Sequence, residues 1–118
     1  MKPDLRQEFL LAARLQDGGQ LEDAVRLLKS LASRDPASTT ILATLGGVYF
    51  DRGMFGAAAV VFEKATTLAP TSEAMSLGLF HSLWELGQRD EALQEIARFQ
   101  AVGTCLDYIR IIKTINDA

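Results

Sequence analysis

A spacing of 34 residues recurs along this chain of 118 residues, and it constrains the fold more than any other feature of the sequence. The clearest columns at this spacing are Gly19, Gly53 and Gly87; Ala24, Ala58 and Ala92; and Leu11, Leu45 and Leu79. Self-similarity at a period of about 20 to 50 residues is typical of chains that stack supersecondary units into a solenoid. The spacing therefore predicts three stacked copies of one small unit.

Each copy carries two stretches with the pattern of an amphipathic helix. In the middle copy Leu42, Leu45 and Tyr49 recur at intervals of three and four residues, which places them on one face of a helix. The glycine column falls between the two stretches, where a residue that accepts a positive φ ends the first helix. We therefore expect a helical hairpin in each copy. The seven expected helices lie near residues 4–17, 21–34, 38–51, 55–68, 72–86, 89–101 and 105–116.

The alanine column and two prolines refine this hairpin. The alanines fall early in the second helix, where a methyl group lets the two backbones approach closely. Pro36 and Pro70 stand where the second helix must stop, because proline lacks the backbone N–H and crowds the preceding turn. Thr104 takes this place in the third copy, and with Asp107 three residues later it predicts an N-terminal capping box for the last helix.

Together these residues resemble the tetratricopeptide repeat (TPR), since Leu45-Gly46, Tyr49, Ala58, Phe62 and Pro70 stand at the family's characteristic places in the middle repeat. The third repeat departs from the pattern, with Ser76 where the family prefers Trp and Phe80 at the usual Gly. The resemblance implies an all-α fold, a right-handed α-solenoid of three helical hairpins with a C-terminal capping helix. It also implies a single TPR domain over residues 1–118, with repeats at 5–38, 39–72 and 73–106 and the capping helix at 105–116.

The same resemblance implies a concave groove, lined by the first helix of each repeat, that receives a peptide or helix of a partner protein. The positions carried over are Arg6, Phe9, Leu10, Ala13, Gln16 and Asp17; Thr40, Ala43, Thr44, Gly47, Phe50 and Asp51; and Ala74, Leu77, Gly78, His81, Trp84 and Glu85. Short side chains in the middle predict a trough, with Phe9, Phe50, His81 and Trp84 as its walls. Alternatively, Phe50 and Trp84 pack between neighbouring helices.

An acidic ladder, formed by Asp17, Asp51 and Glu85, repeats at 34 residues near the ends of the three first helices. Three carboxylates on one edge favour a partner with Lys or Arg beside its apolar anchors. Alternatively, they serve solubility only. The Lys and Asn residues of the TPR dicarboxylate clamp have no match, so a chaperone with an acidic tail is not the expected partner.

Composition excludes several other functions. The net charge of −3 and the pI near 5.1 argue against nucleic acid or an anionic membrane as the main partner. No apolar run approaches the roughly 18 residues of a membrane helix, so membrane insertion is not expected. With one Cys and one His, the sequence predicts no enzyme, no metal site and no cofactor. The single cysteine and the lack of an apolar signal segment predict the cytoplasm.

The C-terminal helix carries an apolar arc formed by Cys105, Tyr108, Ile109, Ile111, Ile112 and Ile115. In one interpretation this arc caps the apolar face of the third repeat, as a terminal repeat requires, and Cys105 is a small packing residue. In the other, Tyr108 and Ile111 stay partly exposed and form a homodimer or partner contact.

The sequence thus predicts a non-enzymatic protein–protein interaction module, an adaptor, scaffold or chaperone that holds a partner segment in its groove. Two alternatives remain open. The first is a small cytoplasmic chaperone of a secretion apparatus, and the second is a structural module that forms homo-oligomers.

Overall fold

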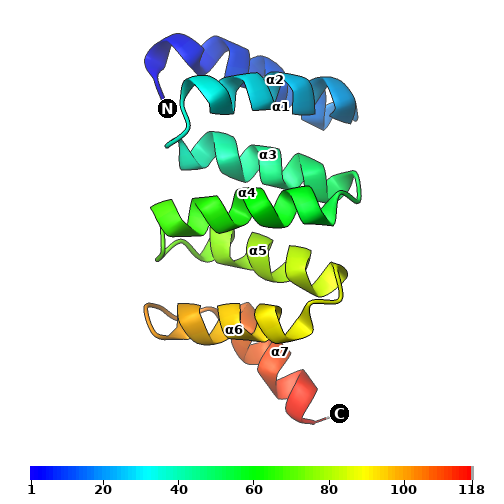
Figure 1. The fold of residues 1–118 in the computed structure, drawn as a ribbon, viewed down its shortest axis with the longest axis vertical. Coiled ribbons are helices and arrows are strands. Elements are labelled where there is room, and N and C mark those ends of the chain that lie inside the picture. The colour runs from blue at the N-terminus through cyan, green and yellow to red at the C-terminus, as the bar shows by residue number, and fades with distance from the viewer. Residues whose placement is uncertain (118) are drawn as a thin grey trace.

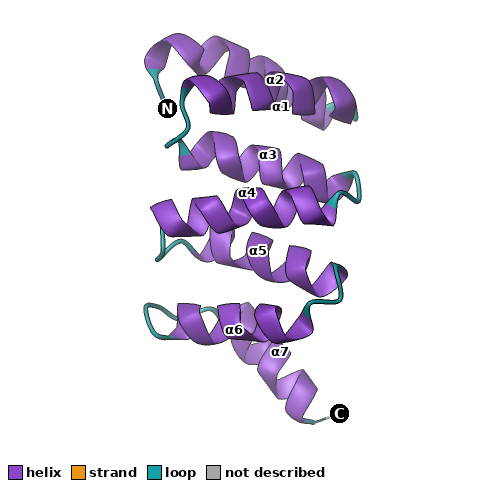
Figure 2. Cartoon of the chain, viewed as in Figure 1, coloured by secondary structure: helices purple, strands orange, loops and turns teal. Residues whose placement is uncertain are grey.

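The computed structural model describes residues 1–117, which form a stack of helices (Figure 1). A short 3-10 helix, η1 (Pro3–Leu5), precedes seven α-helices. These are α1 (Arg6–Asp17), α2 (Leu21–Arg34), α3 (Thr39–Asp51), α4 (Phe55–Leu68), α5 (Glu73–Glu85), α6 (Arg89–Gln100) and α7 (Leu106–Asn116). The remainder of the described chain is loop and turn, without a strand (Figure 2). The predicted all-α class and the seven predicted helices are confirmed.

The glycine column ends the first helix of each hairpin as predicted. Gly19, Gly53 and Gly87 have φ values of 76°, 74° and 78°. Around Gly53, its own N–H donates to the carbonyl of Phe50 and the N–H of Met54 donates to the carbonyl of Tyr49, at 2.9 and 2.8 Å. This pair of bonds is a Schellman motif, which satisfies carbonyls that the helix end leaves free. The same pair recurs at Gly19 and Gly87, so three identical turns fold the chain into three hairpins.

Each connection between two hairpins ends at a serine that caps the N-terminus of the next helix. Ser38 and Ser72 precede α3 and α5, and each hydroxyl accepts a bond from the backbone N–H three residues later, at 3.3 Å. A serine at this position satisfies one of the orphan amides of the helix. The capping box predicted for α7 is wrong, because Cys105 occupies the N-cap and no side chain bonds there.

The helices pack in chain order, and their buried side chains form two clusters. The first cluster extends from Leu5 through α1 to α5, and the second joins α5, α6 and α7 around Phe80 and Phe99. The alanine column is fully buried where the two helices of each hairpin meet. The structure is elongated, with principal extents of 47 × 26 × 19 Å. None of the helices within residues 1–117 is long and apolar enough to cross a membrane.

The C-terminal helix α7 diverges from the stack (Figure 1) and is held against the second cluster by Tyr108, Ile111 and Ile112. Tyr108 is 0% exposed, and it is the only residue of α7 that is buried. Of the two interpretations of the apolar arc, the one that leaves Tyr108 partly exposed is wrong, because its ring is buried against Phe80 and Phe99 as the capping interpretation expects. Cys105 is buried as predicted, and burial raises the pKa of its thiol. Ile111 is half-buried, whereas Leu106 and Ile109 are exposed.

Candidate functional site

The first helices of the repeats and α7 form one face of the stack, which we call the first-helix face. Between α3 and α5 this face opens into a pocket of about 430 Å³, the central pocket. Apolar atoms form most of its lining. Its lining residues are Gly47, Phe50, Asp51, Phe62, Gly78 and His81. All of these except Phe62 belong to the groove positions that the sequence predicts.

The central pocket is floored by a phenylalanine that reaches it from α4. A Cβ built on Gly46 would lie 2.8 Å from the Phe62 ring, and one built on Gly78 would lie 2.4 Å from it. Side-chain carbons do not approach that closely, so the ring fits between α3 and α5 only because both positions are glycine. At Gly78 the space expected to form part of a trough is therefore filled by the Phe62 ring.

A second pocket of about 310 Å³ lies between α5 and α7, and we call it the C-terminal pocket. Its lining residues are Phe80, His81, Trp84, Ile111, Thr114 and Ile115. His81 lines both pockets, so the two adjoin across α5. His81 and Trp84 were predicted groove positions, and Ile111 was one candidate for a partner contact; Phe80, Thr114 and Ile115 were in neither set. The sequence does not show where α7 lies relative to α5, so it could not predict that these residues line a pocket with Trp84.

The aromatic side chains of this face pack against neighbouring helices and also line the pockets. Trp84 stacks on Phe80 with ring centroids 5.7 Å apart, and the Arg89 guanidinium carbon lies 4.7 Å from the Trp84 ring centre. Phe50 meets Phe55 edge to face at 5.0 Å. Both Phe50 and Trp84 are half-buried. The two alternatives for these residues are thus compatible, since Phe50 and Trp84 each pack against a core cluster and also line a pocket.

The acidic ladder is placed as the sequence suggests. Asp17, Asp51 and Glu85 are the last residues of α1, α3 and α5, and all three are exposed. None of them takes part in an ion pair with another of residues 1–117. Asp51 also lines the central pocket. A free carboxylate therefore stands at the edge of an apolar pocket.

The other predicted groove residues lie outside the two pockets. Phe9 is half-buried and packs against the first core cluster, so it does not form a free wall. A Cβ on Gly47 would lie 3.9 Å from the side-chain nitrogen of Gln16, which shows how closely α1 and α3 approach. The remaining positions on α1, α3 and α5 are exposed or half-buried and line neither pocket; they are Arg6, Leu10, Ala13, Thr40, Ala43, Thr44, Ala74 and Leu77.

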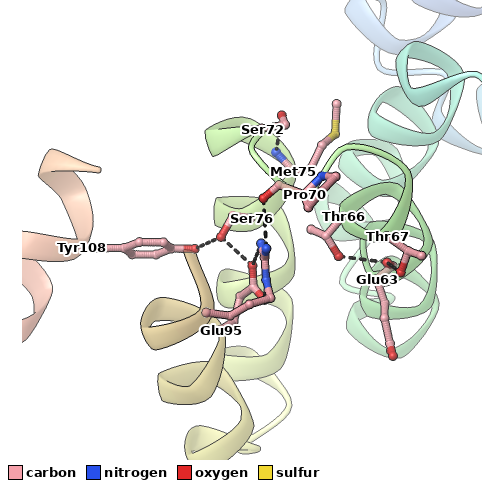
Figure 3. Close-up of polar contacts among 10 residues, drawn as sticks. Glu63, Thr66, Thr67, Pro70, Ser72, Met75, Ser76, Glu95 and Tyr108 are labelled. Carbon is pink, nitrogen blue, oxygen red and sulfur yellow. Dashed lines mark hydrogen bonds and ion pairs between the residues drawn. The ribbon is translucent and has the colours of Figure 1, made fainter. Parts of the chain in front are cut away.

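A buried polar cluster holds α7 in the position that completes the C-terminal pocket (Figure 3). Ser76 Oγ donates to Glu95 Oε2 at 2.6 Å and lies 2.6 Å from Tyr108 Oη. Since the single hydroxyl proton of Ser76 is directed at the carboxylate, Tyr108 donates to Ser76. Burial raises the pKa of Tyr108 well above its ordinary value, which keeps this donor protonated.

Arg98 completes the cluster and compensates the buried carboxylate. Its Nε and one terminal nitrogen bond both oxygens of Glu95, at 2.7 and 2.6 Å, and its other terminal nitrogen bonds the carbonyl of Pro70 at 2.9 Å. The bonds to Glu95 raise the pKa of Arg98. A paired, fully bonded carboxylate is tolerated in a core where an isolated one is not. The departure from the TPR pattern at Ser76 thus has a reason, since a small hydroxyl there links α5, α6 and α7.

Comparisons with known proteins agree with this architecture. Residues 49–101 match the profile of the tetratricopeptide repeat. The Yersinia enterocolitica type III secretion translocator chaperone SycD superposes with a TM-score of 0.78 at 17% identity, covering 99% of this chain and 89% of SycD. SycD in complex with a peptide of the translocator YopD superposes with a TM-score of 0.80 at 16% identity, covering 99% and 90%.

A third solved structure, MamA from Desulfovibrio magneticus RS-1, superposes with a TM-score of 0.76 at 24% identity. The match covers 86% of this chain and 57% of that one, so this chain spans little more than half of that MamA structure. No curated protein matches the sequence. The repeat register, the three identical turns, the profile match over residues 49–101 and these solved structures agree in showing a helical solenoid of the tetratricopeptide-repeat type.

Proposed function

We propose that this protein is a non-enzymatic interaction module that binds a segment of another protein on its first-helix face. The observation that carries the proposal is the pair of adjoining apolar pockets beside the unpaired carboxylate of Asp51. Aromatic side chains in a pocket are the usual source of binding energy in a protein interface. The ligand that fits this chemistry is a peptide or helix with apolar anchors next to Lys or Arg.

The charges define the manner of recognition. The acidic ladder stands at the ends of three successive first helices, so its field extends along the edge of the groove. Exposed rim charges chiefly raise the association rate, whereas buried apolar contacts slow dissociation. The apolar anchors thus supply affinity, and the ladder selects basic partners over acidic ones.

A second, narrower candidate is a cytoplasmic chaperone for a component of a secretion apparatus. The observation that favours it is the match to SycD over almost the whole of both chains, together with the YopD peptide bound by SycD. In that role a single TPR domain shields an aggregation-prone client before export. The general module and the chaperone differ in the client and share the proposed site.

The test is a comparison of affinity baits. Wild-type protein, Phe50→Ala, Trp84→Ala and the control Lys64→Ala, an exposed residue of α4, are immobilised and exposed to lysate of the native host. Each captured protein is then divided into overlapping synthetic peptides, whose Kd for each variant is measured.

The proposal expects a peptide that loses on the order of tenfold to several hundredfold in affinity with either aromatic variant and little with Lys64→Ala. Capture that survives both aromatic changes and is lost with Lys64→Ala would place the partner on the opposite face. A chaperone role further expects one abundant client that aggregates when it is purified alone.

A further inference from the structure

We propose that Phe62 is the specificity-determining residue of the central pocket. Its ring sets the depth of the pocket and so selects the size of the apolar side chain that a bound peptide inserts beside Asp51. The inference rests on the proposed peptide-binding function and adds the residue that chooses among peptides. Phe62 belongs to a second helix, which the groove positions of the family do not include.

The geometry shows why this ring, and not a first-helix side chain, forms the floor. Phe62 is 7% exposed and lines the central pocket together with Phe50 and His81. It passes between α3 and α5 at Gly46 and Gly78, where any side chain would collide with it. The ring is therefore held from both sides by backbone, and its outer edge ends at the pocket.

The repeat register provides an internal comparison. The residues equivalent to Phe62 are Leu28 and Ile96, which are 0% and 2% exposed. The residues 34 positions before Gly46 and Gly78 are Ala12 and Thr44, beside Leu28. The residues 34 positions after them are Phe80 and Ile112, beside Ile96. Around Leu28 and around Ile96, both of these positions thus carry a side chain, whereas around Phe62 both are glycine. Only the middle junction combines two glycines with a large aromatic residue from the second helix.

The remaining walls define the chemistry of the inserted group. Phe50, Phe62 and His81 line the pocket, while Asp51 is an exposed member of the lining and has no cationic partner among residues 1–117. An apolar side chain with a Lys or Arg close to it in the peptide satisfies both features. Because the floor is rigid, a longer apolar group cannot enter without moving the ring.

The experiment uses a phage-displayed library of random twelve-residue peptides as the probe. Selections are run in parallel on the wild-type protein, on Phe62→Leu and on the control Leu28→Val. The control shortens the side chain of the fully buried residue at the same register in the first repeat. Leucine is the residue at this register in the first repeat (Leu28), so Phe62→Leu introduces a side chain that the repeat already contains at this position. Thermal melts check folding, and Phe62→Met is used if the leucine variant does not melt cooperatively.

The expected result is a shift in one apolar position of the selected peptides. Phe62→Leu should select a larger residue there than the wild type does, while Leu28→Val should select the same residue as the wild type. The best peptide of each protein should bind the other protein with a Kd about tenfold higher. This is the effect of one or two carbon atoms in a fitted apolar pocket.

Two results would overturn the inference, and they differ in what else they exclude. If both proteins select the same size and the selected peptides lose affinity with Phe50→Ala, the groove binds peptides but Phe62 only packs. If no peptide is enriched, or the enriched peptides bind Phe50→Ala and Trp84→Ala as tightly as wild type, the proposed function fails and the inference with it.

Discussion

The phenol oxygen of Tyr108 lies 2.6 Å from Oγ of Ser76, and this contact joins α7 to the third repeat through the buried carboxylate of Glu95. The bond connects residues 32 positions apart in the chain. Tyr108 is the sole buried residue of α7, and Ile111 and Ile112 pack beside it against the same cluster. Ile111, Thr114 and Ile115 then form one wall of the C-terminal pocket.

We first predict that Tyr108 and Ser76 are energetically coupled. Tyr108→Phe should lower the free energy of unfolding by about 1 kcal/mol, because it removes one neutral hydrogen bond. Ser76→Ala should cost about 1–3 kcal/mol, because it leaves the buried Tyr108 hydroxyl without a partner and removes one of the two bonds that Glu95 Oε2 accepts. Urea denaturation of the wild type, both single variants and the double variant gives the coupling energy through a double-mutant cycle. Strictly additive losses would contradict a direct interaction between the two residues.

The second prediction concerns alkaline pH. Burial raises the pKa of Tyr108 in the folded protein, so the folded state keeps a proton that the unfolded state releases above its ordinary pKa of about 10. The contribution of Tyr108 to stability is complete below that pH and is lost as the pH rises through the window above it. The stability difference between wild type and Tyr108→Phe should therefore change by about 1.4 kcal/mol per pH unit in that window, in favour of the variant. A difference that stays constant from pH 8 to about 11 would show that the phenol is accessible.

A third prediction tests the packing of Phe62 against two glycines. Gly78→Ala should cost about 1–3 kcal/mol, because the new methyl would lie 2.4 Å from the ring and must displace it. Gly47→Ala is the matched control, since its Cβ would have only one neighbour within 4 Å, at 3.9 Å. Thermal or urea unfolding measures both. Equal effects of the two substitutions would mean that the ring does not lie between α3 and α5.

The fourth prediction is that the acidic ladder lowers stability while it serves recognition. Asp17, Asp51 and Glu85 stand at helix C-termini, where a negative charge opposes the helix dipole. Changing each to Lys should raise the free energy of unfolding by about 0.5 kcal/mol per site at low ionic strength. The gain should disappear at about 1 M salt, where the Debye length is near 3 Å. The same variants should associate more slowly with a basic peptide, and stopped-flow mixing measures that rate.

Much of the fold could be predicted because its signals are local. A positive φ at Gly19, Gly53 and Gly87 is required by the turn itself, so the spacing of these glycines located all three hairpins. The bounds of α2 and α4 agree with the predicted ranges 21–34 and 55–68. The N-cap of α7 was wrong because Thr104 and Asp107 have the right types for a capping box, but Cys105 occupies the N-cap and no side chain bonds there.

The site could be predicted only in part, because pockets depend on side chains from different helices. Gly47, Phe50, Asp51, Gly78 and His81 were assigned to the groove from their register alone, and they line one pocket. Phe62 was identified only as a residue of the repeat pattern, and its place in the pocket depends on the absence of side chains at Gly46 and Gly78. The burial of Tyr108 was left open between two interpretations, since the apolar arc of α7 does not reveal that its hydroxyl bonds Ser76, which in turn bonds Glu95.

The separation of the buried side chains into two clusters has a consequence for native-state dynamics. In a stacked array each repeat contacts only the adjacent repeats, so the chain behaves as a row of coupled units. The cluster around Phe80, Phe99 and Tyr108 is the smaller one, and it ends the row. Helices α6 and α7 should therefore open as one foldon while α1 to α4 stay closed. Amide hydrogen exchange under mild denaturant would record this foldon as a group of slow amides released together, at a lower free energy than global unfolding.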